Sequence, residues 1–444
     1  MQRRFQSFSI TDFKKIKQQM LNFGNRFNIC AFLDNHQYQL PGHEMECLAG
    51  FGCVKEIRCE VAGENTNQGD AKVGVLANRK NSLLQLQEFL DNTNDWCFGH
   101  LSYDLKNEIE ELTSEHENKI GFPVLCFFEP QYVLQLNEQQ LKIGSFADDH
   151  AQLFEQICAM EVNDEQSNSV EVKERMSREQ YISTIKKIQQ HILRGDCYEL
   201  NYCMEFFAES ANINPVQVYQ SLTKISPNPF SAFYKVHNKY LLCASPERFL
   251  RKKGNELLSQ PIKGTLKRDV HNWEEDEVLK QQLFKSEKDR SENVMVVDLV
   301  RNDLSRVCKE GTVKVDELFG IYSFPQVHQM ISTVSGEMND GITFKQIIEA
   351  TFPMGSMTGA PKRRVMQLID EFEPTARGIF SGAMGYISPE KDFDFNVVIR
   401  SILYNESNNY LSYLVGSGIT WYSDAANEYD ECLLKAEAIR SVLG

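Results

Sequence analysis

Residues 289–304 read DRSENVMVVDLVRNDL, a run in which acidic side chains stand directly beside apolar ones. The apolar residues recur at helical spacing, so we expect a helix over Ser291–Val300. On that helix Asp289 and Glu292 would project from one face, because residues three apart are neighbours there. Val294-Met295-Val296-Val297 follows at once. The carboxylates therefore border a core, where they are costly unless they are paired or bind a metal.

A second acidic pair, Glu428 and Glu431, repeats this spacing and runs into Cys432-Leu433-Leu434. We expect it on a final helix that begins after Ser423-Asp424. Two such helices facing each other could hold a hard cation such as Mg2+ and leave coordination positions for water and an anionic substrate. Acidic pairs on helices are more often solvated faces, so the sequence pattern alone leaves both interpretations open.

The remaining periodic segments come in runs of strands and runs of helices, which predicts the α+β class. A capping box at Ser177 and Gln180 begins a helix that ends near Gly195. A further helix is expected over Pro361–Phe372. Expected strands are Tyr240–Cys243, Phe249–Lys252, Leu257–Ile262, Gly382–Ser388, Phe395–Tyr404 and Tyr410–Val415.

Between Met160 and Met176 the chain loses its apolar periodicity, which indicates a solvated linker. We therefore divide the sequence into a divergent N-terminal part, residues 1–165, and a motif-rich catalytic part, residues 170–444. A length of 444 residues fits either two domains or one large interwoven unit.

Composition excludes several classes of protein. The net charge is −15 with dispersed Lys and Arg, so nucleic acid and anionic membranes are not expected partners. No stretch of eighteen apolar residues is present. The twelve cysteines form no C-x-x-C pair and read as reduced thiols, which predicts a cytoplasmic protein.

Four short segments could carry chemistry on an anion. Gly355–Lys362 is a small-residue loop, containing Ser356, that leads into a helix. Gly416-Ser417-Gly418 after a strand would allow a ligand to approach the backbone. Lys263 ends an apolar strand, where burial would lower its pKa and make it a nucleophile. Glu247 could be a general acid with a raised pKa. An ordinary loop, a turn, a snorkelling lysine and a surface glutamate are the competing interpretations.

Taken in order, these segments resemble the chorismate-utilising family of anthranilate, aminodeoxychorismate, isochorismate and salicylate synthases, over roughly 177–443. The resemblance rests on six motifs in register: SPERF (245–249), PIKGT (261–265), DRSENVMVVDLVRNDL (289–304), TGAPK (358–362), GSGI (416–419) and EYDE (428–431). It implies a large interwoven unit with stacked, mainly antiparallel β-sheets and helices outside.

The resemblance also implies a set of site residues. Mg2+ would be bound by Glu292 and Glu431, with Asp289 and Glu428 supporting them. Arg400 and Tyr386 would bind the enolpyruvyl carboxylate of chorismate. The ring carboxylate would meet Mg2+ and the amides of Gly416 and Gly418, with Ser356 nearby.

Within the family, Lys263 indicates the aminodeoxychorismate branch, because anthranilate synthases resemble this segment but carry Ala there. That branch implies attack of Lys263 on C2, protonation of the 4-hydroxyl by Glu247, and amination of C4 by ammonia. Ammonia would come from a glutamine amidotransferase subunit, because this chain has no G-x-C-x-G nucleophile elbow. The alternatives are an anthranilate synthase large subunit and a non-catalytic, ligand-binding subunit.

Two positions depart from the family pattern. Many relatives have Gln at the position of Glu199, and the isochorismate and salicylate branches place a water-activating lysine in this segment. Many have His at the position of Gln329, a role that His328 could have taken over. Residues 32–35 and 227–230 also resemble segments that bind tryptophan in relatives, and the sequence leaves open whether they do so here.

Overall fold

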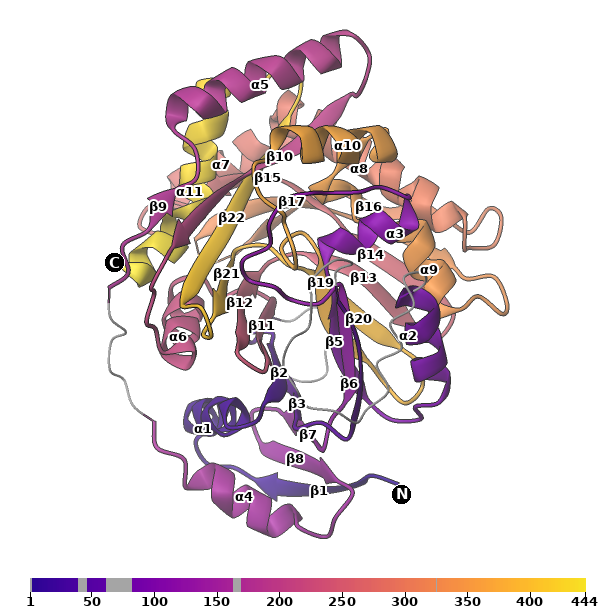
Figure 1. Cartoon of the computed structure of the whole chain (residues 1–444), viewed down its shortest axis with the longest axis vertical. Coiled ribbons are helices and arrows are strands. Elements are labelled where there is room, and N and C mark those ends of the chain that lie inside the picture. The colour runs from indigo at the N-terminus through magenta and orange to yellow at the C-terminus, as the bar shows by residue number, and fades with distance from the viewer. Residues whose placement is uncertain (1, 39–45, 61–81, 163–168, 325) are drawn as a thin grey trace.

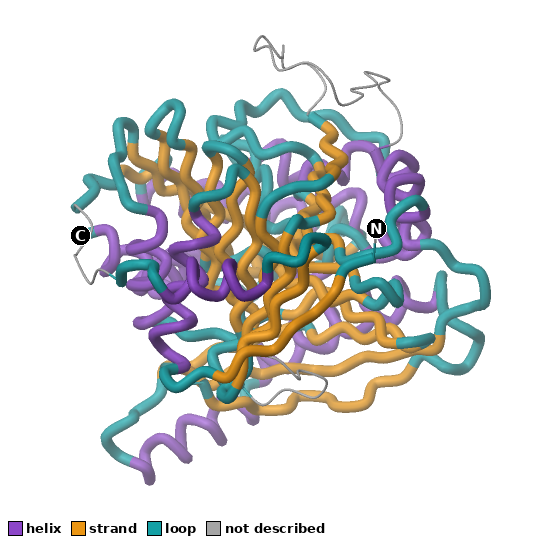
Figure 2. The backbone as a smooth tube through the Cα atoms, turned by 90° about the horizontal axis from the view of Figure 1, so that it is seen from below, coloured by secondary structure: helices purple, strands orange, loops and turns teal. Residues whose placement is uncertain are grey.

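Two large antiparallel β-sheets and the helices around them form the fold, which confirms the predicted α+β class. The structure is a computed structural model that describes residues 2–38, 46–60, 82–162, 169–324 and 326–444. Figure 2 shows the strands stacked through the middle of the molecule, with helices along the outside.

The first sheet has twelve strands, all paired antiparallel. In spatial order they are β1 (Arg4–Ser9), β8 (Gln140–Ser145), β7 (Tyr132–Leu136), β3 (Cys47–Phe51), β2 (Ile29–Asp34), β11 (Phe230–Val236), β12 (Lys239–Ser245), β21 (Ser401–Asn405), β22 (Tyr410–Ile419), β10 (Glu199–Ala208) and β18 (Gly359–Ala360), with β9 (Lys173–Glu174) beside β10.

The second sheet has ten strands and is also antiparallel. Their order is β15 (Ile262–Lys267), β17 (Val327–Glu337), β14 (Glu256–Gln260), β13 (Arg248–Lys253), β20 (Phe393–Val397), β19 (Ala383–Ile387), β5 (Cys97–Leu101), β6 (Leu125–Glu129) and β4 (Lys55–Cys59), with β16 (Lys314–Ser323) beside β17.

Helices cover the outer faces of both sheets. The helices are α1 (Phe13–Asn25), α2 (Ser82–Asp91), η1 (Tyr103–Leu105), α3 (Lys106–Ile109), α4 (His150–Cys158), α5 (Arg178–Leu193), α6 (Pro215–Ile225), α7 (Trp273–Lys285), α8 (Glu287–Ser305), α9 (Phe344–Thr351), η2 (Gly355–Met357), α10 (Lys362–Phe372) and α11 (Ala425–Leu443). Helices α1, α4, α5, α6 and α11 pack with the first sheet, and α2, α8 and α9 with the second.

The first sheet is buried on both faces, and strand β2 shows why. Ile29 and Ala31 face a core shared with the second sheet, whereas Cys30 and Phe32 face a core shared with the helices. Alternate residues of a strand point to opposite faces. Burial on both sides therefore requires an apolar residue at nearly every position, and ICAFLD meets this requirement.

Both predicted parts of the chain contribute a block of neighbouring strands to each sheet, and the two blocks join by direct pairing. In the first sheet β2 pairs with β11, and in the second β5 pairs with β19. Figure 1 shows the indigo N-terminal strands side by side with later ones. The division into residues 1–165 and 170–444 thus remains a prediction about the sequence. The linker that marks it, residues 163–168, lies outside the described residues.

The predicted helices are confirmed: α5 begins at the capping box of Ser177 and Gln180, and α8, α10 and α11 cover the other three. Three strand predictions need correction. The segment 257–262 covers β14 and the first residue of β15, with Pro261 between them, so Lys263 lies near the start of a strand and not at its end. The segment 395–404 is not one strand but two, β20 and β21, which belong to different sheets and break at Arg400. Gly416-Ser417-Gly418 lies inside β22 rather than after a strand.

No helix among the described residues is both long and apolar enough to cross a bilayer. All twelve cysteines are free thiols, and nine of them are buried. This agrees with the prediction of reduced thiols.

Candidate active site

A cavity of about 200 Å³ lies where strands of both sheets meet helices α8 and α11. It collects most of the predicted site residues from distant parts of the sequence. Nine of the eleven line it: Glu247, Lys263, Asp289, Glu292, Ser356, Arg400, Gly416, Gly418 and Glu431. The two others, Glu428 and Tyr386, lie elsewhere.

Glu428 sits directly behind the cavity wall. It is 2% exposed, its Oε1 accepts a hydrogen bond from Lys288 at 2.9 Å, and its Oε2 accepts one from the Ser417 hydroxyl. Glu428 therefore contacts two residues that line the cavity, in agreement with a supporting role.

Tyr386 is a correction, because it lines a second cavity of about 290 Å³ together with Trp96 and Asp394. It lies on β19, where a one-residue difference in register reverses the face to which a side chain points. The aromatic residue at the first cavity is Phe380, which precedes that strand and has no hydroxyl. Tyr386 is thus not placed to bind a ligand together with Arg400.

Lys263 on β15 is 9% exposed, and its Nζ donates a hydrogen bond to Glu199 Oε1 at 2.6 Å. Burial alone would lower the pKa of Lys263. The carboxylates of Glu199, Glu292 and Glu247 outweigh burial and raise that pKa above its ordinary value. Burial therefore does not decide this pKa: Lys263 is a buried ammonium held by an ion pair.

Gly418 makes room for that ion pair. A Cβ at this position would stand 2.6 Å from Glu199 Oε1 and 2.9 Å from Lys263 Nζ. Any side chain larger than glycine would displace the pair. At Gly416 a Cβ would stand 2.5 Å from Cys203 Sγ. The two glycines thus allow side chains of the neighbouring β10, as well as a ligand, to approach the strand closely.

Glu247 and Arg400 also line the cavity, and Glu247 is 4% exposed. Glu247 lies between β12 and β13, and burial raises its pKa to about 7, although Ser356 and Lys263 act in the opposite direction. Burial lowers the pKa of Arg400 to about 10, against the effect of Glu247. Arg400 has φ of +50°, a left-handed conformation at the break between β20 and β21 that turns the chain from one sheet to the other.

The acidic residues of α8 and α11 meet at the cavity and suit a hard cation. Their donors are all oxygens, as Mg2+ prefers. Among the described residues none donates a hydrogen bond to the buried Oε1 of Glu292, and burial raises the pKa of this group to about 7. Such an atom is costly to bury without a partner. The residues present therefore fit a bound divalent ion.

Several cavity residues were not predicted as site residues. Lys288 and Lys435 contribute ammonium groups next to the acidic residues, and Lys435 Nζ lies 2.8 Å from Glu431 Oε1. Gln329 lines the cavity, whereas His328 bonds to Ser323 and Asp276 and does not line it. His328 therefore does not take over the role that the sequence left open. Lys288 precedes Asp289 in the sequence, but nothing in the sequence distinguishes it from an ordinary surface lysine.

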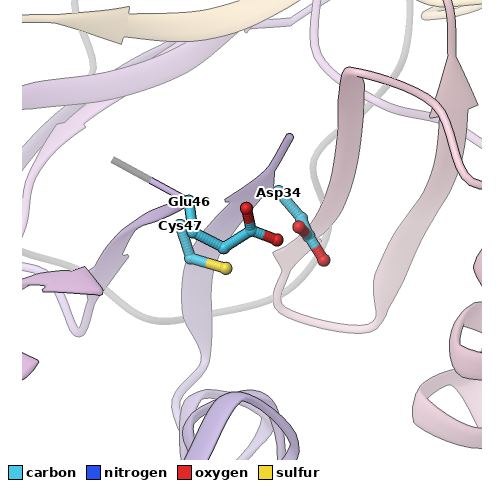
Figure 3. A group of neighbouring side chains, drawn as sticks. All are labelled: Asp34, Glu46 and Cys47. Atoms are coloured by element: carbon cyan, nitrogen blue, oxygen red, sulfur yellow. The ribbon is translucent and has the colours of Figure 1, made fainter. Parts of the chain in front are cut away.

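A separate acidic group lies at the second cavity. Asp34 at the end of β2, Cys47 at the start of β3 and Glu46 just before it point toward one another (Figure 3), and they offer ligand atoms within 4.8 Å of each other. Lys17 of α1 forms an ion pair with both carboxylates, with Nζ 2.7 Å from Asp34 Oδ2 and 2.9 Å from Glu46 Oε1. This makes it a paired structural cluster.

The two segments that resemble tryptophan-binding segments of relatives, residues 32–35 and 227–230, also meet at the second cavity. Leu33, Asp34 and Asn35 line it from one side, and Pro229 and Phe230 line it from another. Tryptophan binding there stays a prediction.

Comparison with known proteins gives a family. The model of chorismate binding enzymes matches residues 30–441. The anthranilate synthase component I of Streptococcus pneumoniae has a similar fold, with a TM-score of 0.75 and 23% identity, over 91% of this chain and 94% of that one.

Three curated relatives are similar in sequence. An anthranilate synthase component I-like protein of Synechocystis is 34% identical over 78% of this chain and 72% of its own. Aminodeoxychorismate synthase component 1 of Bacillus subtilis is 38% identical over 59% of this chain and 55% of its own. That of Escherichia coli is 34% identical over 77% of this chain and 76% of its own.

Proposed function

Since the chain belongs to the family of chorismate binding enzymes, we propose that it is the large subunit of an aminodeoxychorismate synthase. It would convert chorismate and ammonia to 4-amino-4-deoxychorismate, a precursor of 4-aminobenzoate and folate. The observation that carries this proposal is Lys263, whose ammonium lies in the cavity between Glu199 and Glu247. An anthranilate synthase of the same family would carry Ala there.

The charge of the cavity suits a substrate with two carboxylates. Arg400, at the deep end, would pair with the enolpyruvyl carboxylate. The ring carboxylate would lie along Gly416 and Gly418, near Lys435, whose Nζ is 3.0 Å from Gly416 O. The substrate ring would then lie over Lys263, between the two carboxylate subsites.

Lys263 must lose a proton before it can attack C2 of the ring, because an ammonium has no free electron pair. Glu199 is placed to accept that proton across the 2.6 Å hydrogen bond. Glu247 is protonated below a pKa of about 7 and would donate its proton to the departing 4-hydroxyl, which leaves as water. Ammonia then attacks C4, the Nζ–C2 bond breaks, and Lys263 recovers its proton.

Glu292 and Glu431 would bind Mg2+, supported by Asp289 and Glu428. The ion would supply positive charge next to the ring carboxylate. Without it, the acidic residues of α8 and α11 would repel a substrate anion.

A glutamine amidotransferase subunit would provide the ammonia. The B. subtilis and E. coli relatives are each named component 1, which points to a second component. The free thiols fit a cytoplasmic enzyme.

Chromatography of the product formed from chorismate, ammonium salt and Mg2+ tests the proposal. We expect 4-amino-4-deoxychorismate. Anthranilate would instead identify the other amination branch, and a lack of chorismate consumption would favour a non-catalytic subunit. Product formed by the homogeneous chain from glutamine would contradict the need for a partner.

A further inference from the structure

One lysine, Lys288, stands among three of the predicted metal ligands. Its Nζ is 2.9 Å from Glu428 Oε1, 3.9 Å from Glu292 Oε1 and 3.9 Å from Glu431 Oε2. The glutamates come from two helices, α8 and α11. Among the described residues, Lys435 forms an ion pair with one of these glutamates, whereas Lys288 lies within 4 Å of all three.

The position of Lys288 on its helix is unfavourable in itself. It lies in the first turn of α8, just after the N-cap Ser286, where the helix dipole favours anions and disfavours cations. Attraction to the three glutamates is the interaction that compensates. The first turn also contains Glu287 and Asp289, the residue types that the dipole favours.

The side chain of Lys288 is 49% exposed, whereas those of Glu428 and Glu292 are 2% and 10% exposed. A lysine carries its charge at the end of a flexible stem. The ammonium can therefore move out to solvent without unpacking the core, while the carboxylates stay in place.

The spacing around Lys288 suits an ammonium and not a magnesium ion. Mg2+ binds its oxygen ligands at about 2.0–2.1 Å, much closer than the nitrogen–oxygen distances here. The four predicted carboxylates do not form a group whose ligand atoms all lie within 4.8 Å of one another in the described part of the chain. An ion bridging α8 and α11 would need the space that the ammonium occupies.

We propose that Lys288 is an internal counter-ion which occupies the cation position of the acidic cluster and must be displaced when a divalent ion binds. This rests on the proposed function only in taking Mg2+ as the natural ion. Metal binding is then a competition between two cations, and in the free protein the ammonium offsets part of the negative charge of the three carboxylates until the ion arrives.

Direct binding of Mn2+, followed by the EPR signal of the free ion, tests the proposal on the full chain. Lys288→Met keeps the apolar stem and removes the competing charge. We expect it to bind Mn2+ about tenfold more tightly, which corresponds to about 1.4 kcal/mol. Lys285→Met is the matched control: it removes the same charge from an exposed site at the end of α7, and should change affinity less than about twofold because of screening.

A second readout follows stability without metal. Lys288→Met leaves the glutamates to repel one another, so its urea midpoint should fall below that of the wild type and recover when Mn2+ saturates the site. If the Met variant does not fold, Lys288→Gln replaces it with the same expected direction.

Equal or weaker Mn2+ binding by folded Lys288→Met would overturn the proposal, because the lysine would then not compete with the metal. That result would leave the proposed enzymatic function intact. Failure of the wild type to bind Mn2+ at all would overturn both this proposal and the Mg2+ part of the function, whereas product chromatography with ammonium still tests the reaction itself.

Discussion

Two regions of the molecule place a lysine among acidic side chains, and they differ in how completely the charges are satisfied. At the second cavity, Lys17 reaches Asp34 and Glu46 at 2.7 and 2.9 Å. At the first cavity, Lys288 faces three glutamates and reaches hydrogen-bonding distance with Glu428 alone. One cluster is a closed ion-pair network, and the other retains unpaired acidic oxygen.

The pKa shifts follow this difference. Burial would lower the pKa of Lys17, but Cys47, Asp34 and Glu46 together raise it. At the first cavity burial raises the pKa of Glu292 to about 7, and its Oε1 accepts no hydrogen bond from the described residues. The comparison teaches that a buried carboxylate held by an ion pair depends on its cation to remain buried, whereas one with an unpaired oxygen is a candidate to bind an external cation.

The largest effect should come from Lys263→Ala, which removes the nucleophile. Amination of chorismate should fall by about 10³-fold or more. Lys267→Ala on the same strand, with a side chain 68% exposed, should leave the rate unchanged. Intact mass spectrometry after incubation with chorismate and Mg2+, without ammonium, should show an adduct that maps to Lys263. An adduct on another residue would remove the covalent role.

Glu292→Gln and Glu46→Gln, matched changes in the two clusters, test the comparison directly. The first should lower Mg2+-dependent turnover by roughly 10²-fold or more with little loss of stability. The second should lower stability and leave the turnover of the folded protein unchanged. Calorimetric titration of Mg2+ in the presence of chorismate checks the first variant. If Glu292→Gln binds Mg2+ with unchanged affinity, the unpaired oxygen of Glu292 does not mark a metal site.

Glu247→Gln should lower kcat/KM by about 10²-fold, because the general acid is lost. In the wild type, kcat/KM should fall as pH rises through about 7, since Glu247 acts in its protonated form below that pKa. This fall of kcat/KM should be absent from the pH profile of the variant. If kcat/KM of Glu247→Gln still falls near pH 7, another group is responsible for the titration.

Lys17→Met should leave two buried carboxylates without a cation and destabilise the fold by about 3 kcal/mol. Urea unfolding measures this loss. Because burial raises the pKa of Glu46, this carboxylate becomes uncharged as pH falls, and the difference from the wild type should shrink. Loss of turnover beyond the unfolded fraction would show that the two clusters are coupled.

The smallest effect should come from Tyr386→Phe, since this hydroxyl lies at the second cavity. KM for chorismate should change less than about twofold, whereas Arg400→Met should raise it strongly by removing a buried cation from the first cavity. A large increase of KM for chorismate in Tyr386→Phe would show that this tyrosine does contact the substrate.

Local patterns were enough to predict most helices, several strands and nine residues of the cavity. The prediction for Tyr386 was wrong because a sequence motif identifies the strand but not the face of the sheet to which each of its side chains points. The pKa of Lys263 could not be predicted, because its partner Glu199 comes from another strand 64 residues away. Lys288 was visible in the sequence, yet only the approach of α11 distinguishes it from a surface lysine.

Among the described residues, strands β21 and β22 alone connect β12 to β10 in the first sheet. Figure 1 shows them in yellow, whereas β12 and β10, which come earlier in the sequence, are magenta. On the ribosome, both neighbours emerge more than 150 residues before β21, which begins at Ser401. During that interval each has an unpaired edge, a template for aggregation. A chain that stalls before Ser401 therefore carries two strand edges whose backbone groups lack their native partners.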